Sequence, residues 1–313
     1  MKNITILGGG VLGTQIAFQS AFMGKKVTIW LRSEDSIKRT KPKLEMVKKS
    51  YIDAINLMAS KEGNELSNWS FGISDVNHFN KKELLQRTED TFESIIIELD
   101  IKKALKDCDL VIESMSEDFK AKKDLLMKIA PILNSKTIVA TNSSTLLPSK
   151  LAKYSKREDK FLALHFANSI WKNNVVEVMK HEKTNDKVFK NVINFAKSIN
   201  MIPMPLYKEK SGYLLNSMLI PFLFSALDLL AMGISDVESI DETWKKGTGA
   251  VKGPFEIIDT IGLKTAHDIV LMYVKIPAII APYHFKEIEK LLKKYIDEGK
   301  LGKNSKRGFY KYE

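Results

Sequence analysis

A histidine and a glutamate lie close together in the stretch HFANSIWKNNVVEVM, residues 165 to 179. His165 stands at the end of the apolar run FLALHF, and Glu177 stands inside the next run, VVEVM. If the two runs are strands that pair antiparallel around Trp171, His165 faces Glu177. A carboxylate beside an imidazole holds its tautomer and stabilises the imidazolium, which improves a proton acceptor. The pair therefore predicts a general base; a hydrogen-bonded core histidine beside an unrelated glutamate is the alternative.

Short runs rich in Val, Ile and Leu predict the strands that must carry these side chains. Segments with helical spacing separate them, which indicates repeated β-α units and a mainly parallel sheet. The runs are ITILG at 4–8, VTIWL at 27–31, LVIES at 110–114, TIVATN at 137–142 and FLALHF at 161–166.

Two regions depart from this rhythm. Residues 41–92 predict two amphipathic helices around a polar loop at 62–80, an insertion that stands off the sheet. From Ser211 onward the chain is almost wholly helical. The change of class predicts two domains, 1–205 and 206–313. We expect the second to form a homodimer, because the apolar helix at 214–232 must bury its surface.

A glycine-rich turn follows the first predicted strand. The sequence GGGVLG places Gly8, Gly10 and Gly13 in G-x-G-x-x-G spacing before a helical stretch. Glycines permit a tight turn and let a pyrophosphate approach the helix N-terminus, where free N–H groups favour an anion. The spacing is weak alone, but its place in the first β-α unit predicts a dinucleotide site that includes Val11 and Leu12. A turn with only a structural role is the alternative.

The end of the second predicted strand bears on which dinucleotide is bound. An acidic residue there normally holds the adenosine ribose diol, whereas this chain has Leu31, Arg32 and Ser33. A guanidinium and a hydroxyl would bind a 2′-phosphate that a carboxylate would repel. We therefore expect NAD or NADP and favour NADP, although Glu34 and Asp35 lie close enough to keep NAD open.

Composition narrows the class of protein. The chain has 313 residues, 44% hydrophobic and 28% charged, enough for two globular domains. Its net charge of +11 does not predict nucleic-acid binding, because aromatic and basic residues are not interleaved. The longest apolar run, 218–234, contains Pro221 and Asp228, so we expect a buried helix rather than a membrane span. The single cysteine, Cys108, predicts a reducing, cytoplasmic setting, and no histidine spacing predicts a metal site.

The stretch HFANSIWKNNVVEVM resembles the signature of the L-3-hydroxyacyl-CoA dehydrogenase family, which is close to H-F-x-N-P followed by V-E. The likeness covers nearly the whole chain, with GGGVLGTQIA, DLVIESMSED, TNSSTLLPSKLA, SGYLLNSMLIPFL, GTGAVKGPFEIIDTIGL and GKLGKNSKRGFYKY in family order. The resemblance implies an α/β fold, with an N-terminal Rossmann doubly wound sheet, a helical-hairpin insertion and an all-α C-terminal domain. It also implies reversible oxidation of an L-3-hydroxyacyl-CoA to the 3-ketoacyl-CoA, for which we favour short acyl chains.

The resemblance also implies roles for single residues. It makes His165 the general base and Glu177 its partner, and it places Ser144 and Asn216 at the substrate's oxygen atoms. A helix cap for Ser144 and a capping or interhelical amide for Asn216 are the alternatives. The residues that it implies for the cofactor, beyond the glycine turn and the end of the second strand, are Glu117, Lys122, Asn142, Ser144 and Asn168.

Departures from the family pattern leave the substrate open. Ser169 replaces the usual proline after Asn168, and IWKNN at 170–174 replaces a more apolar loop. Residues 41–100, where the family binds the nucleotide end of CoA, match the family pattern poorly. In the C-terminal segment, Asn304 stands where a second lysine often follows Lys303, which weakens any cofactor role for that segment. A free 3-hydroxy acid or sugar acid is therefore an alternative substrate. A dinucleotide-binding protein without turnover is the other alternative, but an oriented base has no use in such a protein.

Overall fold

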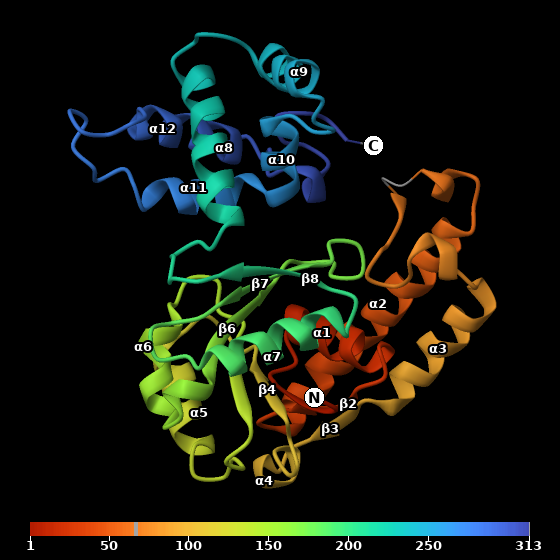
Figure 1. Cartoon of the computed structure of the whole chain (residues 1–313). Helices are drawn as coiled ribbons and strands as arrows, with labels where there is room; N and C mark the ends of the chain where they lie inside the picture. The colour runs from red at the N-terminus through yellow and green to blue at the C-terminus, as the bar shows by residue number, and fades with distance from the viewer. Residues whose placement is uncertain (66–67, 313) are drawn as a thin grey trace. The chain divides into compact units, whose positions relative to one another are not determined.

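The computed structural model describes residues 1–65 and 68–312. Its contacts divide the chain into two compact units, Met1–Leu214 and Leu215–Glu313 (Figure 1). The division lies beyond the expected boundary at 205, because the segment after the last strand stays attached to the first unit: the Tyr213 hydroxyl donates to the Ser143 carbonyl at 2.6 Å. Leu66 and Ser67, inside the polar loop expected at 62–80, lie outside the described residues.

Among the described residues of the first unit, eight strands form one sheet, in the order β3-β2-β1-β4-β5-β6-β7-β8. The chain enters at the centre and spreads to both sides, the doubly wound arrangement that the family resemblance implies. Along the described chain, all neighbouring pairs are parallel except β6 and β7. The strands are β1 (Asn3–Leu7), β2 (Lys26–Trp30), β3 (Ile96–Glu98), β4 (Leu110–Glu113), β5 (Ile138–Thr141), β6 (Phe161–Phe166), β7 (Val175–Met179) and β8 (Ile202–Leu206).

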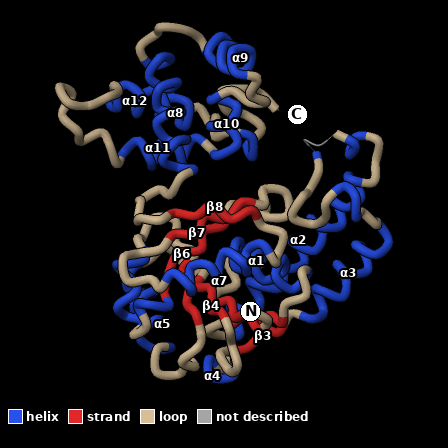
Figure 2. The backbone as a smooth tube through the Cα atoms, viewed as in Figure 1, coloured by secondary structure: helices blue, strands red, loops and turns tan. Residues whose placement is uncertain are grey.

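Helices cover both faces of this sheet (Figure 2). Apolar residues of α1 (Val11–Phe22) and α7 (Asp186–Lys197) pack on one face. Those of α4 (Ile101–Ala104), α5 (Phe119–Ile129) and α6 (Pro148–Ala152) pack on the other. Side chains alternate along each strand, so Ile112 of β4 joins the first layer and Val111 the second.

The expected helical insertion is present as α2 (Glu34–Met58) and α3 (Lys81–Ser94) (Figure 1). We call this hairpin the arm. Tyr51 of α2 is fully buried against Phe18 of α1, with ring centroids 4.7 Å apart. The sequence predicts that the first helix of the insertion begins near residue 41. In the structure α2 begins earlier, at Glu34, because the Ser33 side chain caps its N-terminus, and Pro42 lies within the helix without ending it.

The second unit is helical, with α8 (Leu215–Ala231), α9 (Val237–Thr248), α10 (Pro254–Ile261), α11 (Leu263–Leu271) and α12 (Phe285–Asp297) around one apolar core. Its C-terminal segment is held by Asp259, whose carboxylate accepts the Phe309 and Tyr310 N–H groups, both at 2.9 Å. Among the described residues, we find no helix whose length and apolar character would let it cross a membrane.

Candidate active site

The β6–β7 hairpin brings His165 and Glu177 together. They are direct partners in the antiparallel register, as the spacing of the two runs predicts. Nδ1 of the imidazole lies 3.0 Å from Oε2 of the carboxylate, and the side chains are 13% and 6% exposed. On the other side of the ring, Nε2 lies 3.2 Å from Oγ of Ser144. A carboxylate, an imidazole and a hydroxyl therefore stand in one hydrogen-bonded row.

This row orients the imidazole for proton transfer. A carboxylate on the Nδ1 side keeps a proton on that nitrogen, which leaves the Nε2 lone pair directed toward Ser144. The second oxygen of Glu177 accepts the Leu214 N–H at 2.8 Å, so the carboxylate is fixed through both oxygens. Its burial strengthens the attraction between Glu177 and an imidazolium. The geometry is that of a general base with an orienting carboxylate.

Ser144 belongs to a loop that follows β5 at the carboxyl end of the sheet, where open α/β folds bind their ligands. Glu117 fixes this loop by accepting hydrogen bonds from the Ser143 hydroxyl and from the N–H and hydroxyl of Thr145, the last two at 2.8 Å. Burial alone would raise the pKa of Glu117, but these hydrogen bonds and Lys122 outweigh it and lower the pKa to about 2. The loop therefore keeps an ionised anchor at working pH.

A buried ion pair contacts Glu117, the residue that fixes this loop. Lys122 and Glu113 are each 1% exposed, and the ammonium lies 2.8 Å from the carboxylate. Glu113 also accepts the Thr141 hydroxyl at 2.7 Å and the Met115 N–H at 2.8 Å. The Lys122 ammonium, which the family resemblance places near the cofactor, thus pairs with Glu113 and also lies 3.4 Å from Glu117. Its role toward the cofactor stays a prediction. Sequence reasoning missed Glu113, although a carboxylate at the end of an apolar run was the available signal.

The glycine turn opens into a cavity of about 290 Å³. A Cβ added at Gly13 would lie 2.2 Å from the Gly8 carbonyl oxygen, so this glycine permits the close approach of helix and strand. A Cβ at Gly10 would meet only the Ser114 carbonyl oxygen, at 4.0 Å. The turn therefore leaves open space above the N-terminus of α1, which fits a pyrophosphate approaching the backbone N–H groups.

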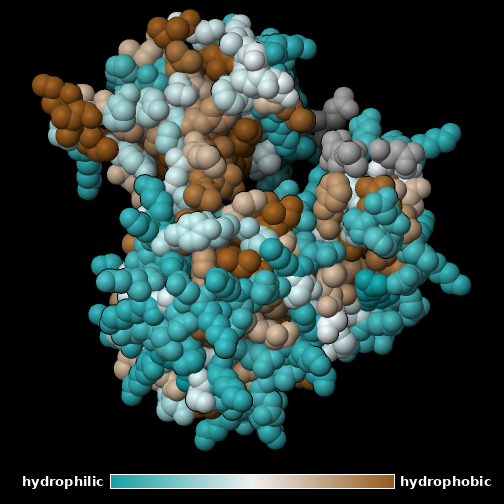
Figure 3. Space-filling view, in the orientation of Figure 1, coloured by the Kyte–Doolittle hydropathy of each residue, from teal (hydrophilic) through white to brown (hydrophobic). Residues whose placement is uncertain are grey.

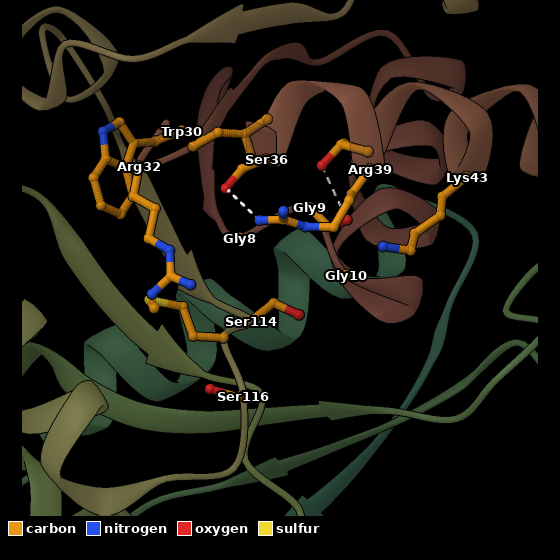
Figure 4. A pocket seen from close by; sticks show the side chains of 13 residues that line it. Gly8, Gly9, Gly10, Trp30, Arg32, Ser36, Arg39, Lys43, Ser114 and Ser116 are labelled. Atoms are coloured by element: carbon orange, nitrogen blue, oxygen red, sulfur yellow. Dashed lines mark hydrogen bonds between the residues drawn. The ribbon is translucent and has the colours of Figure 1, made fainter. Parts of the chain in front are cut away.

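Three basic side chains line this cavity. Arg32 enters from the end of β2, and Arg39 and Lys43 enter from α2 (Figure 4). Arg39 donates to the Ser36 hydroxyl at 3.1 Å. The sequence singled out Arg32 but not Arg39, which comes to the cavity because the first turns of α2 pass the end of β2. Two arginines, a lysine and a hydroxyl form a site suited to a phosphate group.

The other predicted cofactor residues have different surroundings. Leu31 lines the cavity, whereas Ser33 caps α2. Val11 is exposed at the start of α1, and Leu12 packs against the core of the sheet. The cofactor roles of Asn142 and Asn168 stay predictions; the Asn142 side chain accepts the Phe166 N–H at 3.0 Å, and the Asn168 carbonyl accepts from Asn173 at 2.9 Å.

Asn216 is not one of the described residues that line the cavity at the glycine turn. Asn216 is the second residue of α8, in the second unit, and its substrate role stays a prediction. Within residues 1–65 and 68–312, no cluster of three or more His, Cys, Asp or Glu side chains could hold a metal ion.

The unusual loop after Asn168 is tied to both α1 and the arm. Ser169, with a left-handed φ of 57°, donates its N–H to Gln15 at 2.9 Å. The Trp171 carbonyl accepts the Gly72 N–H at 2.9 Å, and the Trp171 ring lies 5.6 Å from that of Tyr51. The serine that replaces the family's proline is thus held in place by the helix that opens at the glycine turn.

Two family models together match nearly the whole chain. The model of the 3-hydroxyacyl-CoA dehydrogenase NAD binding domain matches residues 3–210, and that of the C-terminal domain matches residues 212–312. The human mitochondrial hydroxyacyl-coenzyme A dehydrogenase is 30% identical over 313 residues, covering 100% of this chain and 92% of the relative. A 3-hydroxybutyryl-CoA dehydrogenase of Clostridioides difficile is 35% identical over 208 residues, covering 66% of this chain and 72% of the relative.

Solved structures show the same fold. A diketoreductase, described as catalysing reactions of dicarbonyl compounds, is 42% identical with a TM-score of 0.81, covering 100% of this chain and 99% of the other. The (S)-3-hydroxybutyryl-CoA dehydrogenase of Ralstonia eutropha is 25% identical with a TM-score of 0.78, with the same coverage.

Proposed function

The chain belongs to the 3-hydroxyacyl-CoA dehydrogenase family, and we propose that it interconverts an L-3-hydroxyacyl-CoA and the matching 3-ketoacyl-CoA with a nicotinamide dinucleotide. The observation that carries this proposal is His165 held between the Glu177 carboxylate and the Ser144 hydroxyl. A protein that only binds a dinucleotide gains nothing from an imidazole oriented in this way. Turnover of acetoacetyl-CoA, followed by dinucleotide absorbance, tests the proposal.

His165, Glu177 and Ser144 have different roles in the proposed proton transfer. His165 accepts the proton of the 3-hydroxyl at Nε2, and Glu177 stabilises the imidazolium that forms. Ser144 holds the substrate oxygen beside Nε2, and we assign Asn216 to the substrate from its family position alone. The dinucleotide, when bound at the glycine turn, supplies the hydride acceptor or donor for C3. In the reductive direction His165 returns the proton to the oxygen.

We further propose that the dinucleotide is NADP(H). Arg32, Arg39 and Lys43 line the cavity at the end of β2, and no carboxylate lines it among the described residues. A 2′-phosphate would gain charge-assisted hydrogen bonds there, whereas a ribose diol would lack its usual acidic acceptor. The arrangement supports NADP(H) over NAD(H).

Arg39→Ala tests this preference. We expect the variant to bind NADPH roughly 10- to 100-fold more weakly, the scale of a lost charge-assisted hydrogen bond, with little change for NADH. Fluorescence titration of both dinucleotides measures the effect. Lys38→Ala is the matched control, because Lys38 is 79% exposed and pairs with Asp35. A wild-type protein that binds NADH more tightly than NADPH would refute the preference.

A second candidate substrate is a dicarbonyl compound without CoA. It is favoured by the 42% identity to the diketoreductase and by the loop at 169–174, which the arm contacts through Gly72 and Tyr51. A panel of acetoacetyl-CoA, acetoacetate and an uncharged β-dicarbonyl ester, each with NADH and NADPH, separates the candidates. Equal kcat/KM on the thioester and the unesterified compounds would remove the case for CoA.

We also propose that the second unit forms a homodimer. A largely apolar hollow of about 460 Å³ lies between α8 and α9, lined in part by Phe222, Leu229 and Trp244. Such a surface is more typical of an interface than of a face in water. Sedimentation should give twice the chain mass of 35.5 kDa.

The buried, unpaired Cys108 favours a reducing compartment such as the cytoplasm.

A further inference from the structure

Tyr213 stacks on the imidazole of the proposed base. The two ring centroids are 4.4 Å apart with an interplanar angle of 22°, and Tyr213 is 1% exposed. Its φ is 54°, a left-handed conformation that costs a residue other than glycine of the order of 1 kcal/mol or more. The surrounding contacts therefore determine this conformation, which places the ring against His165.

The hydroxyl of Tyr213 reaches the serine loop. It donates to the Ser143 carbonyl at 2.6 Å, in the peptide that leads into Ser144. Burial, and then the charges of Glu117 and Glu177, raise the pKa of Tyr213 well above its ordinary value. The hydroxyl therefore stays protonated and remains a hydrogen-bond donor throughout the working pH range.

The next residue contacts the third member of the row. The Leu214 N–H donates to Glu177 at 2.8 Å, the carboxylate whose other oxygen faces His165. Tyr213 thus contacts the His165 imidazole and the peptide before Ser144, and Leu214 contacts the Glu177 carboxylate. The aromatic face also presents its negative side to the imidazolium that forms on proton uptake.

On the basis of the proposed function, we propose that Tyr213 is a positioning residue: its ring fixes the plane of the His165 imidazole, and its hydroxyl fixes Ser144 relative to that plane. The residue makes no covalent step and transfers no proton. Its effect on turnover passes through His165 and Ser144, which distinguishes it from a residue that only stabilises the fold.

A double-mutant cycle tests the hydroxyl. Tyr213→Phe keeps the ring, and we expect it to lower kcat about tenfold in the wild-type background and to have almost no effect in the Ser144→Ala background, because coupled residues are not additive. Tyr207→Phe, at an exposed position, is the matched control and should keep wild-type kcat. The same fold-loss in both backgrounds, or no loss in the wild-type background, would overturn the proposal.

An NMR measurement without substrate tests the proposed role of the Tyr213 ring. Protons that lie over an aromatic face resonate upfield, so the His165 ring proton, assigned by comparison with His165→Gln, should keep its NMR position in Tyr213→Phe. In Tyr213→Leu it should move downfield and broaden. An unchanged resonance in Tyr213→Leu would overturn the positioning role. A wild-type protein that turns over no 3-ketoacyl-CoA would instead overturn the proposed function and leave this readout intact.

Discussion

Replacing His165 with glutamine is expected to lower kcat by about two to four orders of magnitude, the usual scale for a lost general base. Glutamine keeps a polar side chain near Glu177 and Ser144 but has no nitrogen that accepts a proton at neutral pH. The glycine-turn cavity does not include residue 165, so dinucleotide affinity should stay nearly unchanged. Steady-state kinetics and a dinucleotide binding titration on the same preparation measure the two effects.

The control for this substitution makes the same chemical change elsewhere. His78 lies on the segment before α3, with a side chain that is 82% exposed, so His78→Gln should retain wild-type kcat. Turnover close to that of the wild type in His165→Gln would remove His165 from the role of base. A parallel loss of dinucleotide binding would indicate a damaged fold rather than lost chemistry.

Replacing Lys122 with methionine is expected to destabilise the first unit by about 3 to 5 kcal/mol, because it leaves the buried Glu113 carboxylate without its counter-charge. Both side chains are 1% exposed, so water cannot replace the lost ammonium. Urea unfolding followed by circular dichroism measures the change.

Two further variants isolate the charge from the packing. Lys120→Met makes the same substitution at an exposed position of α5 and should change stability by less than about 0.5 kcal/mol. Adding Glu113→Gln to Lys122→Met removes the uncompensated charge and should recover part of the loss. A loss below about 1 kcal/mol in Lys122→Met alone would show that the pair is not a determinant of stability.

The architecture follows from features that act over short stretches of sequence. Short runs of Val, Ile and Leu predict the central strands, and the glycine turn after the first of them predicts a dinucleotide site. The edge strand β3 is not predicted, since its three residues, with Ile96 exposed, are too few to show a period of two. The first unit ends later than the change in composition suggests, because Tyr213 and Leu214 bond to residues distant in sequence.

In the candidate site, too, some residues could be predicted from the sequence and others could not. The pairing of His165 with Glu177 is predictable, because the register of one short hairpin decides it. Arg39 and Tyr213 are not, because their importance depends on where α2 passes the cavity and where the chain turns after β8. Residues that gain their role from tertiary packing leave no local pattern in the sequence.

The reversal of direction between β6 and β7 makes the base and its carboxylate a short-range contact. The two residues are 12 positions apart, so one closing hairpin joins them at a small cost in chain entropy. The glycine turn instead meets Thr40 and Ser114, which arrive only after the long parallel crossovers are made. In a refolding chain, the contact between His165 and Glu177 should therefore form before the glycine-turn cavity that would bind the dinucleotide.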